Sequence, residues 1–379
     1  MRVPRSFYPI RDLVARHLPL RPPQACGLAL WVCGALLARS ATQSAVVAAL
    51  AEPGRENTVR QRLREWLRDG ADKARPCATE VDVEACFAPL LRWIASRWPG
   101  RDLPLAIDVT TRRADLTVLA VCVLCGGCAI PVAWRMLPGN RPEPWLDHLL
   151  ELLGRLRAGV PSGRRVVVLT DRGLWSPRLW AGLCDLGFTP LMRVHNHTLV
   201  TLREGGPART AGSLVEAGQA WVGRVELGRV RPMQVTLALV RARGQAQPWA
   251  VATTLAPGTV GARDYGLRLW VELGFRALKS GGLQWQATRR CKPERAARHW
   301  LVLAVVALLS LAQGSRMEAH AGVHPAQGRT VSLFRRGLIA LSKILGTGRG
   351  PPGRWRLSPQ TWPDLPPGVV LINEPIQAC

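Results

Sequence analysis

The sequence has few acidic residues for its length. Its 379 residues include 26 Asp and Glu against 51 Lys and Arg, which gives a formal net charge of +25. Only four of these cations are lysines, so arginine supplies nearly all of the positive charge. An excess spread along the whole chain points to a large polyanionic partner, and to nucleic acid before a membrane surface. Codon bias toward arginine would explain the choice of Arg over Lys, but it explains the shortage of acids less well.

Several other features are missing. The ten cysteines lack the spacing of a disulfide framework, and the N-terminus lacks the apolar core of a signal peptide. The longest apolar runs, 26–38 and 300–311, are too short to span a bilayer comfortably, and buried helices explain them better. Neither an internal repeat nor a nucleotide-binding loop is evident. We therefore expect a cytoplasmic protein without a membrane partner.

The first 98 residues are predicted to be helical. A short apolar helix over 43–51 is followed by the breaker Glu52-Pro53-Gly54. Asn57 can then cap a second helix over 58–68, and a further helix over 81–97 closes the region.

The helix predicted over 58–68 is basic and amphipathic. Its apolar residues recur at i, i+4, i+7 and i+8, while arginines such as Arg60 and Arg64 lie mostly off that stripe. A helix, a short turn and a basic amphipathic helix outline a helix-turn-helix, which would bind DNA through Arg60 and Arg64. An ordinary helix with an arginine-rich solvated face explains the pattern equally well.

The pattern changes from helices to strands near residue 102. Apolar, β-branched runs between Gly and Pro turns predict three strands, a helix, a strand, a helix and a strand: 105–110, 116–124, 128–136, 145–156, 165–170, 177–184 and 188–194. This order predicts an α/β fold, a mixed sheet flanked by helices, and it fits the ribonuclease-H-like order in which the first and fourth strands are neighbours. That adjacency would bring together Asp108 and Asp171, which lie at the ends of those two strands.

The rest of the chain divides by composition. Four further strands, 198–203, 221–227, 233–241 and 249–255, predict a β-rich insertion, although the last of them could instead belong to the main sheet. A buried helix over 295–313 follows. The predicted domains are a helical DNA-binding region (1–98, with the helix-turn-helix at 43–68), a catalytic core (99–195 and 257–316), the insertion (196–256) and a basic, Pro/Gly-rich C-terminal region (317–379).

One stretch gathers four polar residues at helical spacing. Tyr265, Arg268, Glu272 and Lys279 are separated by 3, 4 and 7 positions. On an α-helix, at about 100° per residue, all four would fall within about 60° of arc. Such a stripe has the composition of a catalytic face, but a solvated helix face has the same spacing.

The two strand-end aspartates favour the catalytic interpretation. Asp108 lies inside the apolar run Leu105-Ala-Ile-Asp-Val, where a carboxylate without a partner would be costly to bury, and Asp171 directly follows an apolar strand. Each could also be a capping or turn residue. Together with Glu272, however, they form a set of carboxylates that suits Mg²⁺. Two such ions about 3.5–4 Å apart promote phosphodiester displacement.

These residues resemble the signature of a known family. Tyr265, Arg268, Glu272 and Lys279 match the Y-(2)-R-(3)-E-(6)-K signature of a large group of bacterial insertion-sequence transposases, and the segments around Asp108 and Asp171 resemble that family's first two acidic segments. The resemblance runs from about residue 103 to 311. It implies a ribonuclease-H-like core with a β-rich insertion, and a DDE triad that binds two Mg²⁺ or Mn²⁺ ions.

The resemblance also implies roles for the individual residues. Asp108, Asp171 and Glu272 would be the catalytic metal ligands, while Tyr265, Arg268 and Lys279 would contact DNA ends and phosphates. The activity would be cut-and-paste transposition by a homodimer on double-stranded element ends and target DNA, in a bacterial cytoplasm beside the nucleoid. Two alternatives are a DNA-binding protein that keeps the fold but no longer transposes, and a nuclease that only cuts.

Other clusters are more simply explained by structure. The spacing Cys122-x2-Cys125-x2-Cys128 has the form of a metal motif, but it straddles a predicted hairpin, and packing cysteines are favoured. His195-Asn-His197 is favoured as a polar turn over a metal pair. Trp221 and Trp249 are candidates for a tryptophan that stabilises a DNA hairpin, and a place in the core is favoured for both.

Overall fold

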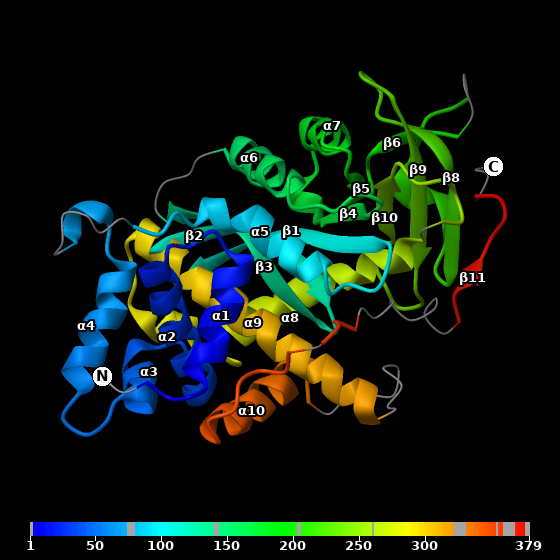
Figure 1. Ribbon diagram of the computed structural model, residues 1–379. Helices are drawn as coiled ribbons and strands as arrows, with labels where there is room; N and C mark the ends of the chain where they lie inside the picture. Colours follow the sequence, from blue (N-terminus) through cyan, green and yellow to red (C-terminus); the bar gives the residue numbers. More distant parts are fainter. Residues whose placement is uncertain are drawn as a thin grey trace. The chain divides into compact units, whose positions relative to one another are not determined.

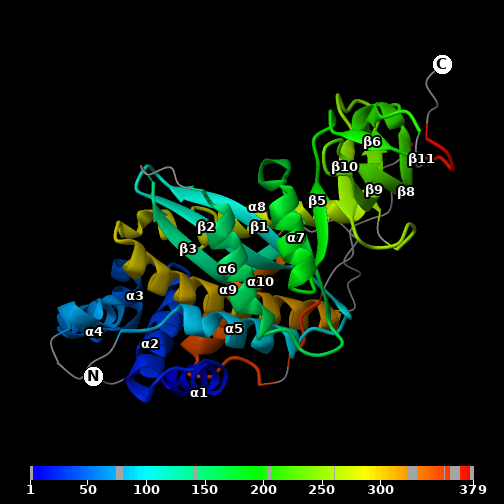
Figure 2. The ribbon, with the colours of Figure 1, turned by 90° about the horizontal axis from the view of Figure 1, so that it is seen from above.

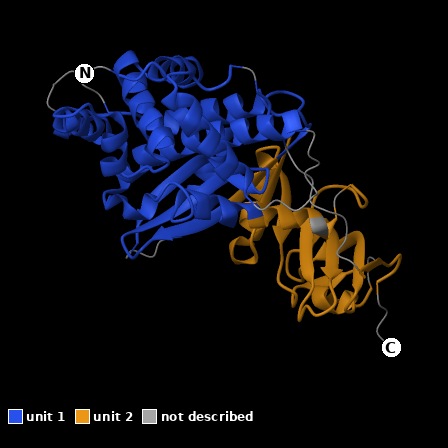
Figure 3. Cartoon of the chain, turned by 90° about the horizontal axis from the view of Figure 1, so that it is seen from below, with its two compact units in different colours: residues 1–103, 108–164, 270–360 blue, residues 104–107, 165–269, 361–379 orange. Residues whose placement is uncertain are grey.

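The computed structural model describes residues 3–73, 80–139, 144–202, 206–259, 261–321, 331–353, 355–358 and 368–375. The chain divides into two compact units. Unit 1 contains residues 1–103, 108–164 and 270–360, and unit 2 contains residues 104–107, 165–269 and 361–379 (Figure 3). Both units combine strands with helices, so the mixed α/β class predicted from the sequence is confirmed.

Unit 1 begins with the predicted helices: α1 (Phe7–His17), α2 (Pro22–Ala38), α3 (Gln43–Leu50), α4 (Glu56–Leu67) and α5 (Phe87–Ala95). The predicted apolar stripe of α4 is buried, and Nε1 of Trp66 donates to the carbonyl of Gln24 on α2 at 2.9 Å. Two boundaries were wrong. Helix α4 begins before Asn57, which therefore lies inside it, and the segment 84–86 is a 3-10 turn that shortens the helix predicted over 81–97.

The sheet of unit 1 is the predicted meander of β1 (Asp102–Arg112), β2 (Leu116–Cys125) and β3 (Cys128–Pro138), in the order β3-β2-β1. Gly126 and Gly127 form the hairpin turn with φ of 60° and 76°. Both angles lie in the left-handed region that glycine adopts without strain, as a two-residue hairpin requires. The antiparallel register of β2 and β3 runs from Leu116 opposite Pro138 to Cys125 opposite Cys128.

Both faces of β3 are covered, because successive side chains on a strand point to opposite faces. Trp134 points to α9 (Pro293–Ala321), where its Nε1 donates to the carbonyl of Ala297 at 3.1 Å. Arg135 points to α6 (Leu146–Arg157) and forms an ion pair of 3.1 Å with Glu151 on that helix. A second ion pair of 2.8 Å joins Arg135 to Glu84. Helices α6 and α9 can be followed in Figure 1.

Helix α9 is the buried helix predicted over 295–313, and it is longer than predicted. By length and composition alone it could cross a membrane, but 89% of its most apolar window is buried inside the structure, as in the core helix of a globular fold. Helix α10 (Leu333–Gly346) packs along α9, as Figure 2 also shows. Helix α10 was not predicted, because the basic, Pro/Gly-rich composition beyond residue 316 indicated irregular segments.

Unit 2 is built on the remaining strands: β4 (Arg165–Thr170), β5 (Thr189–Arg193), β6 (Leu199–Thr201), β7 (Arg209–Thr210), β8 (Gln219–Leu227), β9 (Met233–Arg241), β10 (Trp249–Thr253) and β11 (Val370–Leu371). Residues 104–107 of β1 belong to this unit, and the strand order is β1-β4-β5-β10-β9-β8-β6-β7, with β11 beside β8. The predicted adjacency of the first and fourth strands is therefore confirmed. Strand β10 pairs with both β5 and β9, so it joins the predicted insertion to the strands before it.

The helix of unit 2 begins as predicted. Helix α7 (Pro177–Asp185) has Ser176 as its N-cap, and the Ser176 hydroxyl accepts a hydrogen bond of 3.1 Å from the backbone N–H of Leu179. Proline at the first helical position loses no hydrogen bond. Helix α7 thus connects β4 to β5, which run parallel.

The stretch from Tyr265 to Lys279 is not the single α-helix that the sequence predicted. Tyr265 and Arg268 lie in the 3-10 helix η5 (Ala262–Arg268), Glu272 lies in α8 (Leu269–Leu278), and Lys279 follows the end of α8. Side chains three apart eclipse in a 3-10 helix, so Tyr265 and Arg268 point the same way. Both are buried, with 3% and 8% of their surface exposed. The prediction of a single α-helix, and the solvated-face interpretation of those two residues, are therefore wrong.

The close contact of α10 with α9 gives a test of this packing. We expect Gly337→Ala to lower the free energy of unfolding by about 1–3 kcal/mol or more, since the cost is that of overpacking. The new methyl group would overlap the carbonyl oxygen of Ser310. Gly154→Ala in α6 is the matched control, because nothing lies within 4 Å of its methyl group. It should stabilise the protein by roughly 0.5–1 kcal/mol. Urea unfolding that gave both variants the same stability would contradict the contact.

Candidate functional site

Asp171 lies at the carboxyl end of β4, where the sequence placed it. The residue is half-buried, and its Oδ1 accepts a hydrogen bond of 2.7 Å from the backbone N–H of Arg172. Asp171 therefore caps the short 3-10 turn η3 (Arg172–Leu174). This is the structural role that the sequence analysis kept as its alternative.

A second group holds the same carboxylate. The hydroxyl of Tyr265 donates to Oδ1 of Asp171 at 3.4 Å, across 94 positions of the chain. Burial raises the pKa of Tyr265, and the negative charge of Asp171 raises it further. The phenol therefore stays protonated at neutral pH and remains a donor.

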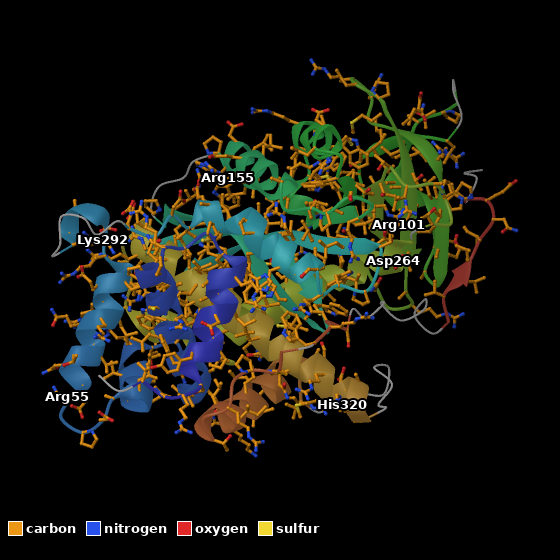
Figure 4. The ribbon with its side chains drawn as sticks, in the orientation of Figure 1. Arg55, Arg101, Arg155, Asp264, Lys292 and His320 are labelled. Atoms are coloured by element: carbon orange, nitrogen blue, oxygen red, sulfur yellow. The ribbon has the colours of Figure 1, made fainter. Side chains whose placement is uncertain are left out.

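The 3-10 helix η5 positions Tyr265 by packing against β4, β5, β9 and β10. Asp264 stabilises the start of η5, because its Oδ2 accepts a hydrogen bond of 2.8 Å from the backbone N–H of Gly261. Figure 4 labels Asp264. The ring of Tyr265 also packs edge-on against Trp249, with centroids 5.6 Å apart. Trp249 therefore lies beside a predicted site residue, while Trp221 is a buried core residue of β8.

Arg193 also lies near Tyr265 and Trp249, although the sequence did not identify it as a site residue. It is the last residue of β5, and its guanidinium lies 6.0 Å from the centroid of the Trp249 ring. Arg193 and Arg268 both lie close enough to Tyr265 to lower its pKa, against the larger effect of burial. Unit 2 thus gathers a carboxylate, a phenol and two arginines. Arginine binds phosphate through paired N–H donors, so such a group suits a phosphodiester.

The position of Arg193 follows from strand register. Strands β4 and β5 are parallel, with Thr170 opposite Met192. Asp171 directly follows Thr170, and Arg193 directly follows Met192. The two residues therefore lie at the same edge of the sheet. An arginine in register with a strand-end aspartate is a signal that the sequence contains, but it becomes visible only once the pairing is known.

Asp108 and Lys279 both lie in unit 1, and the charge of Asp108 acts on Lys279. Asp108 is half-buried on β1, and its Oδ1 accepts a hydrogen bond of 2.9 Å from the backbone N–H of Val109. Burial lowers the pKa of Lys279, and the charge of Asp108 opposes that shift. Asp108 lies inside β1 (Asp102–Arg112), so its predicted place at the end of a strand was wrong, because the strand continues beyond the apolar run. Each aspartate nevertheless lies near one residue of the four-residue signature: Asp171 near Tyr265, and Asp108 near Lys279.

Glu272 lies on the exposed side of α8. The opposite side of the helix packs against β3 at Gly274, where a methyl group would come within 2.8 Å of the backbone nitrogen of Ala129. Asp108 and Glu272 belong to unit 1, and Asp171 belongs to unit 2. Within the described residues, no group of three or more His, Cys, Asp or Glu side chains could hold a metal ion. The carboxylates thus match Mg²⁺ by ligand type, whereas a formed metal cluster is not observed.

The weaker metal candidates have structural roles. Cys122, Cys125 and Cys128 are buried, free thiols of the β2–β3 hairpin. Burial raises the pKa of Cys122, with a further contribution from the charge of Asp108, so its thiol stays protonated and is not prepared to bind a metal. His195 is part of a turn, in which its carbonyl accepts a hydrogen bond of 3.0 Å from the backbone N–H of Thr198.

The two arginines predicted to bind DNA lie on α4. Arg64 is exposed, and Arg60 is half-buried, with its Nη1 donating to Oδ1 of Asn57 at 2.5 Å. The short apolar helix α3 packs against α4 as a helix-turn-helix would require, but this pairing is also common in helical domains. DNA binding by α4 remains a prediction.

Neither the protein-family models nor the curated proteins include a match to this sequence. Among solved structures, the chain is similar to a piggyBac transposase, determined by cryo-electron microscopy as a synaptic complex with hairpin DNA. The two chains are 10% identical, with a TM-score of 0.37, over 86% of this chain and 72% of that one. At this level the likeness establishes neither the detailed fold nor the function of this chain.

The interaction of Asp108 with Lys279 can be tested by nuclear magnetic resonance. Reductive methylation with ¹³C-formaldehyde labels the four lysines, which give few and resolvable signals. Asp108→Asn should lower the pKa of Lys279 further, because it removes the negative charge that raises that pKa. Lys73 is the internal control. Burial lowers its pKa too, but the charges that act on it include Glu65 and not Asp108. A Lys279 pKa that stays constant would contradict the interaction.

Proposed function

We propose that the protein is a DNA transposase of the DDE type. It binds the ends of a mobile element, cleaves DNA strands in a metal-dependent reaction and joins the cut end to target DNA. The observation that carries this proposal is that two signature residues lie near the two predicted aspartates. Tyr265 donates to Asp171 at 3.4 Å, and Lys279 lies in the field of Asp108. The sequence spacing that suggested the signature contains no information about either pairing.

The proposed ligands of Mg²⁺ or Mn²⁺ are Asp108, Asp171 and Glu272, chosen by ligand chemistry and by their places on β1, β4 and α8. Bound ions would activate the attacking oxygen and stabilise the leaving oxygen of the phosphodiester. The proposed core is ribonuclease-H-like, in keeping with the meander β1–β3 and the neighbouring strands β1 and β4.

The chain's own residues have separate proposed roles. Tyr265 holds the carboxylate of Asp171 in one orientation through its hydroxyl. Arg268 and Arg193 bind the phosphate next to the scissile bond, since a guanidinium matches two phosphate oxygens. Lys279 binds DNA beside Asp108. Its partial burial strengthens its interaction with an incoming phosphate, because a charge removed from water is less screened.

The net charge of +25 supports double-stranded DNA as the partner, at element ends and target alike. We propose that α3 and α4 recognise the ends as a helix-turn-helix, and that two copies of the chain act together on DNA in the bacterial cytoplasm. The two other classes considered above, a protein that binds DNA without cutting and a nuclease without strand transfer, are separated from transposition by the following tests.

Alanine substitution tests the proposed triad. Asp108→Ala, Asp171→Ala and Glu272→Ala should each lower Mg²⁺-dependent cleavage of end DNA by about 10²–10³-fold or more, which is the loss seen when one transition-state-stabilising group is removed. DNA binding in a gel-shift assay should remain. Asp185→Ala is the matched control, because Asp185 is an exposed carboxylate at the end of α7. A Glu272→Ala protein that cuts normally would exclude the triad.

The same assay distinguishes the classes of function. Transfer of a cut end into a target plasmid would exclude a nuclease that only cuts. A wild-type protein that binds the ends but never cuts them, with Mg²⁺ or with Mn²⁺, would establish the DNA-binding protein instead.

A further inference from the structure

Four arginines of unit 1 lie close together at the C-terminal end of α4. Arg290, in the loop before α9, lies in the field of Arg64 on α4, Arg112 at the end of β1, and Arg295 in the first turn of α9. They come from four separate segments, and only the fold brings them together. Lys292 belongs to the same loop, and Figure 4 labels it.

Arg290 has no carboxylate partner among the described residues. It is half-buried, and its guanidinium lies 5.4 Å from the centroid of the Trp31 ring. Its Nε is buried without a hydrogen-bond partner. Burial, together with the charges of Arg295, Arg64 and Arg112, lowers the pKa of Arg290 to about 10. Buried charges are ordinarily paired, so Arg290 is an exception that calls for an explanation.

Arg112 is the second incompletely satisfied cation of the group. Only 1% of its surface is exposed, and its Nε is also buried without a partner in the described part of the chain. Its Nη1 donates to Asp115 at 2.9 Å and to the thiol of Cys291 at 3.8 Å. Arg64 is exposed, and no carboxylate in the described ranges pairs with it. Among the described residues, Asp115 is therefore the one carboxylate that pairs with Arg290, Arg112 or Arg64.

Two neighbouring arginines, Arg298 and Arg295, have structural roles, because carboxylates of the chain pair with both. Arg298 is 3% exposed, and it pairs with Asp69 at 2.8 Å and Glu80 at 2.9 Å. Arg295 pairs with Asp69 and with Asp72, the latter at 2.5 Å. Asp69, Asp72 and Glu80 are thus already paired with these two arginines. Arg112 shares the group's carboxylate, Asp115, and within the described ranges no carboxylate pairs with Arg290 or Arg64.

We propose that Arg290, Arg112 and Arg64 form a phosphate-binding site that takes one backbone phosphate of DNA, next to the helix α4 that would recognise the element ends. The site rests on the DNA-binding part of the proposed function, but it does not require cleavage. A phosphate would accept hydrogen bonds from the guanidinium groups of Arg64 and Arg290, and its charge would neutralise the cluster. Contacts to phosphate carry no sequence information, so this site would fix the register of α4 on the duplex.

Arg290→Gln separates this role from a structural one. In the absence of DNA the variant should melt at the same temperature as the wild type or higher, because it loses a repelled, poorly solvated cation. Its affinity for DNA should fall, and the slope of log K against log salt concentration should decrease by about 1, the value for one phosphate contact. Arg64→Gln, at the surface, should give the same change in slope.

The control variant removes one charge elsewhere. Arg155→Gln breaks exposed ion pairs of α6 with Glu151 and Glu84, both remote in sequence from the arginine cluster, and it should leave the salt slope unchanged. Figure 4 labels Arg155. Inorganic phosphate provides a second probe. It should raise the melting temperature of the wild type and of Arg155→Gln, and leave that of Arg290→Gln unchanged.

Each other outcome overturns the proposal in a defined way. An Arg290→Gln protein that melts well below the wild type would make Arg290 a structural residue. An equal loss of slope in Arg155→Gln would reduce the effect to net charge. Stabilisation of the wild type by phosphate without any change of slope in Arg290→Gln would assign the site to a free anion. Because binding and melting are measured without cleavage, a failed cleavage assay would leave these results intact.

Discussion

The chain has too few carboxylates to neutralise its cations, and its architecture depends on where those few are used. Two groups of ion pairs join helices to their neighbours in unit 1: Arg135 with Glu84 and Glu151, and Arg298 with Asp69 and Glu80. After these pairs are made, cations remain that no acid of the described chain neutralises. Two of these cations, Arg290 and Arg64, lie in or beside helix α4, with which the protein is proposed to bind DNA.

Much of the fold could be predicted because its signals are local. The strands Arg165–Thr170 and Met233–Arg241 match the prediction at both ends, since each is an apolar run bounded by turn residues. The hairpin at Gly126-Gly127 follows from backbone freedom alone. Helix α10 was missed because it lies among Pro- and Gly-rich segments and is stabilised by packing along α9. The 3-10 geometry of η5 was missed because it depends on burying Tyr265 and Arg268 together against four strands, which is a tertiary effect.

The residues of the candidate site likewise divide into those with a local sequence signal and those that only the folded chain identifies. Spacing within one segment identified Tyr265, Arg268, Glu272 and Lys279, and the ends of apolar runs identified Asp108 and Asp171. Arg193 and Arg290 were not found, because their relevance comes from strand register and from segments that meet only in the folded chain. Both are arginines in a sequence rich in arginine, where composition cannot separate a phosphate ligand from a solvated side chain.

The central claim is that Asp108, Asp171 and Glu272 bind the same metal ions. Iron tests it most directly. With added hydrogen peroxide and ascorbate, Fe²⁺ substituted for Mg²⁺ reduces the peroxide to hydroxide and a hydroxyl radical, which cuts the backbone next to the bound ion, and ascorbate restores Fe²⁺. In the complex with DNA, the account predicts cuts confined to three segments, around residues 108, 171 and 272, which excess Mg²⁺ suppresses together. Cuts at one or two of these segments only, or at unrelated positions, would contradict a shared metal site.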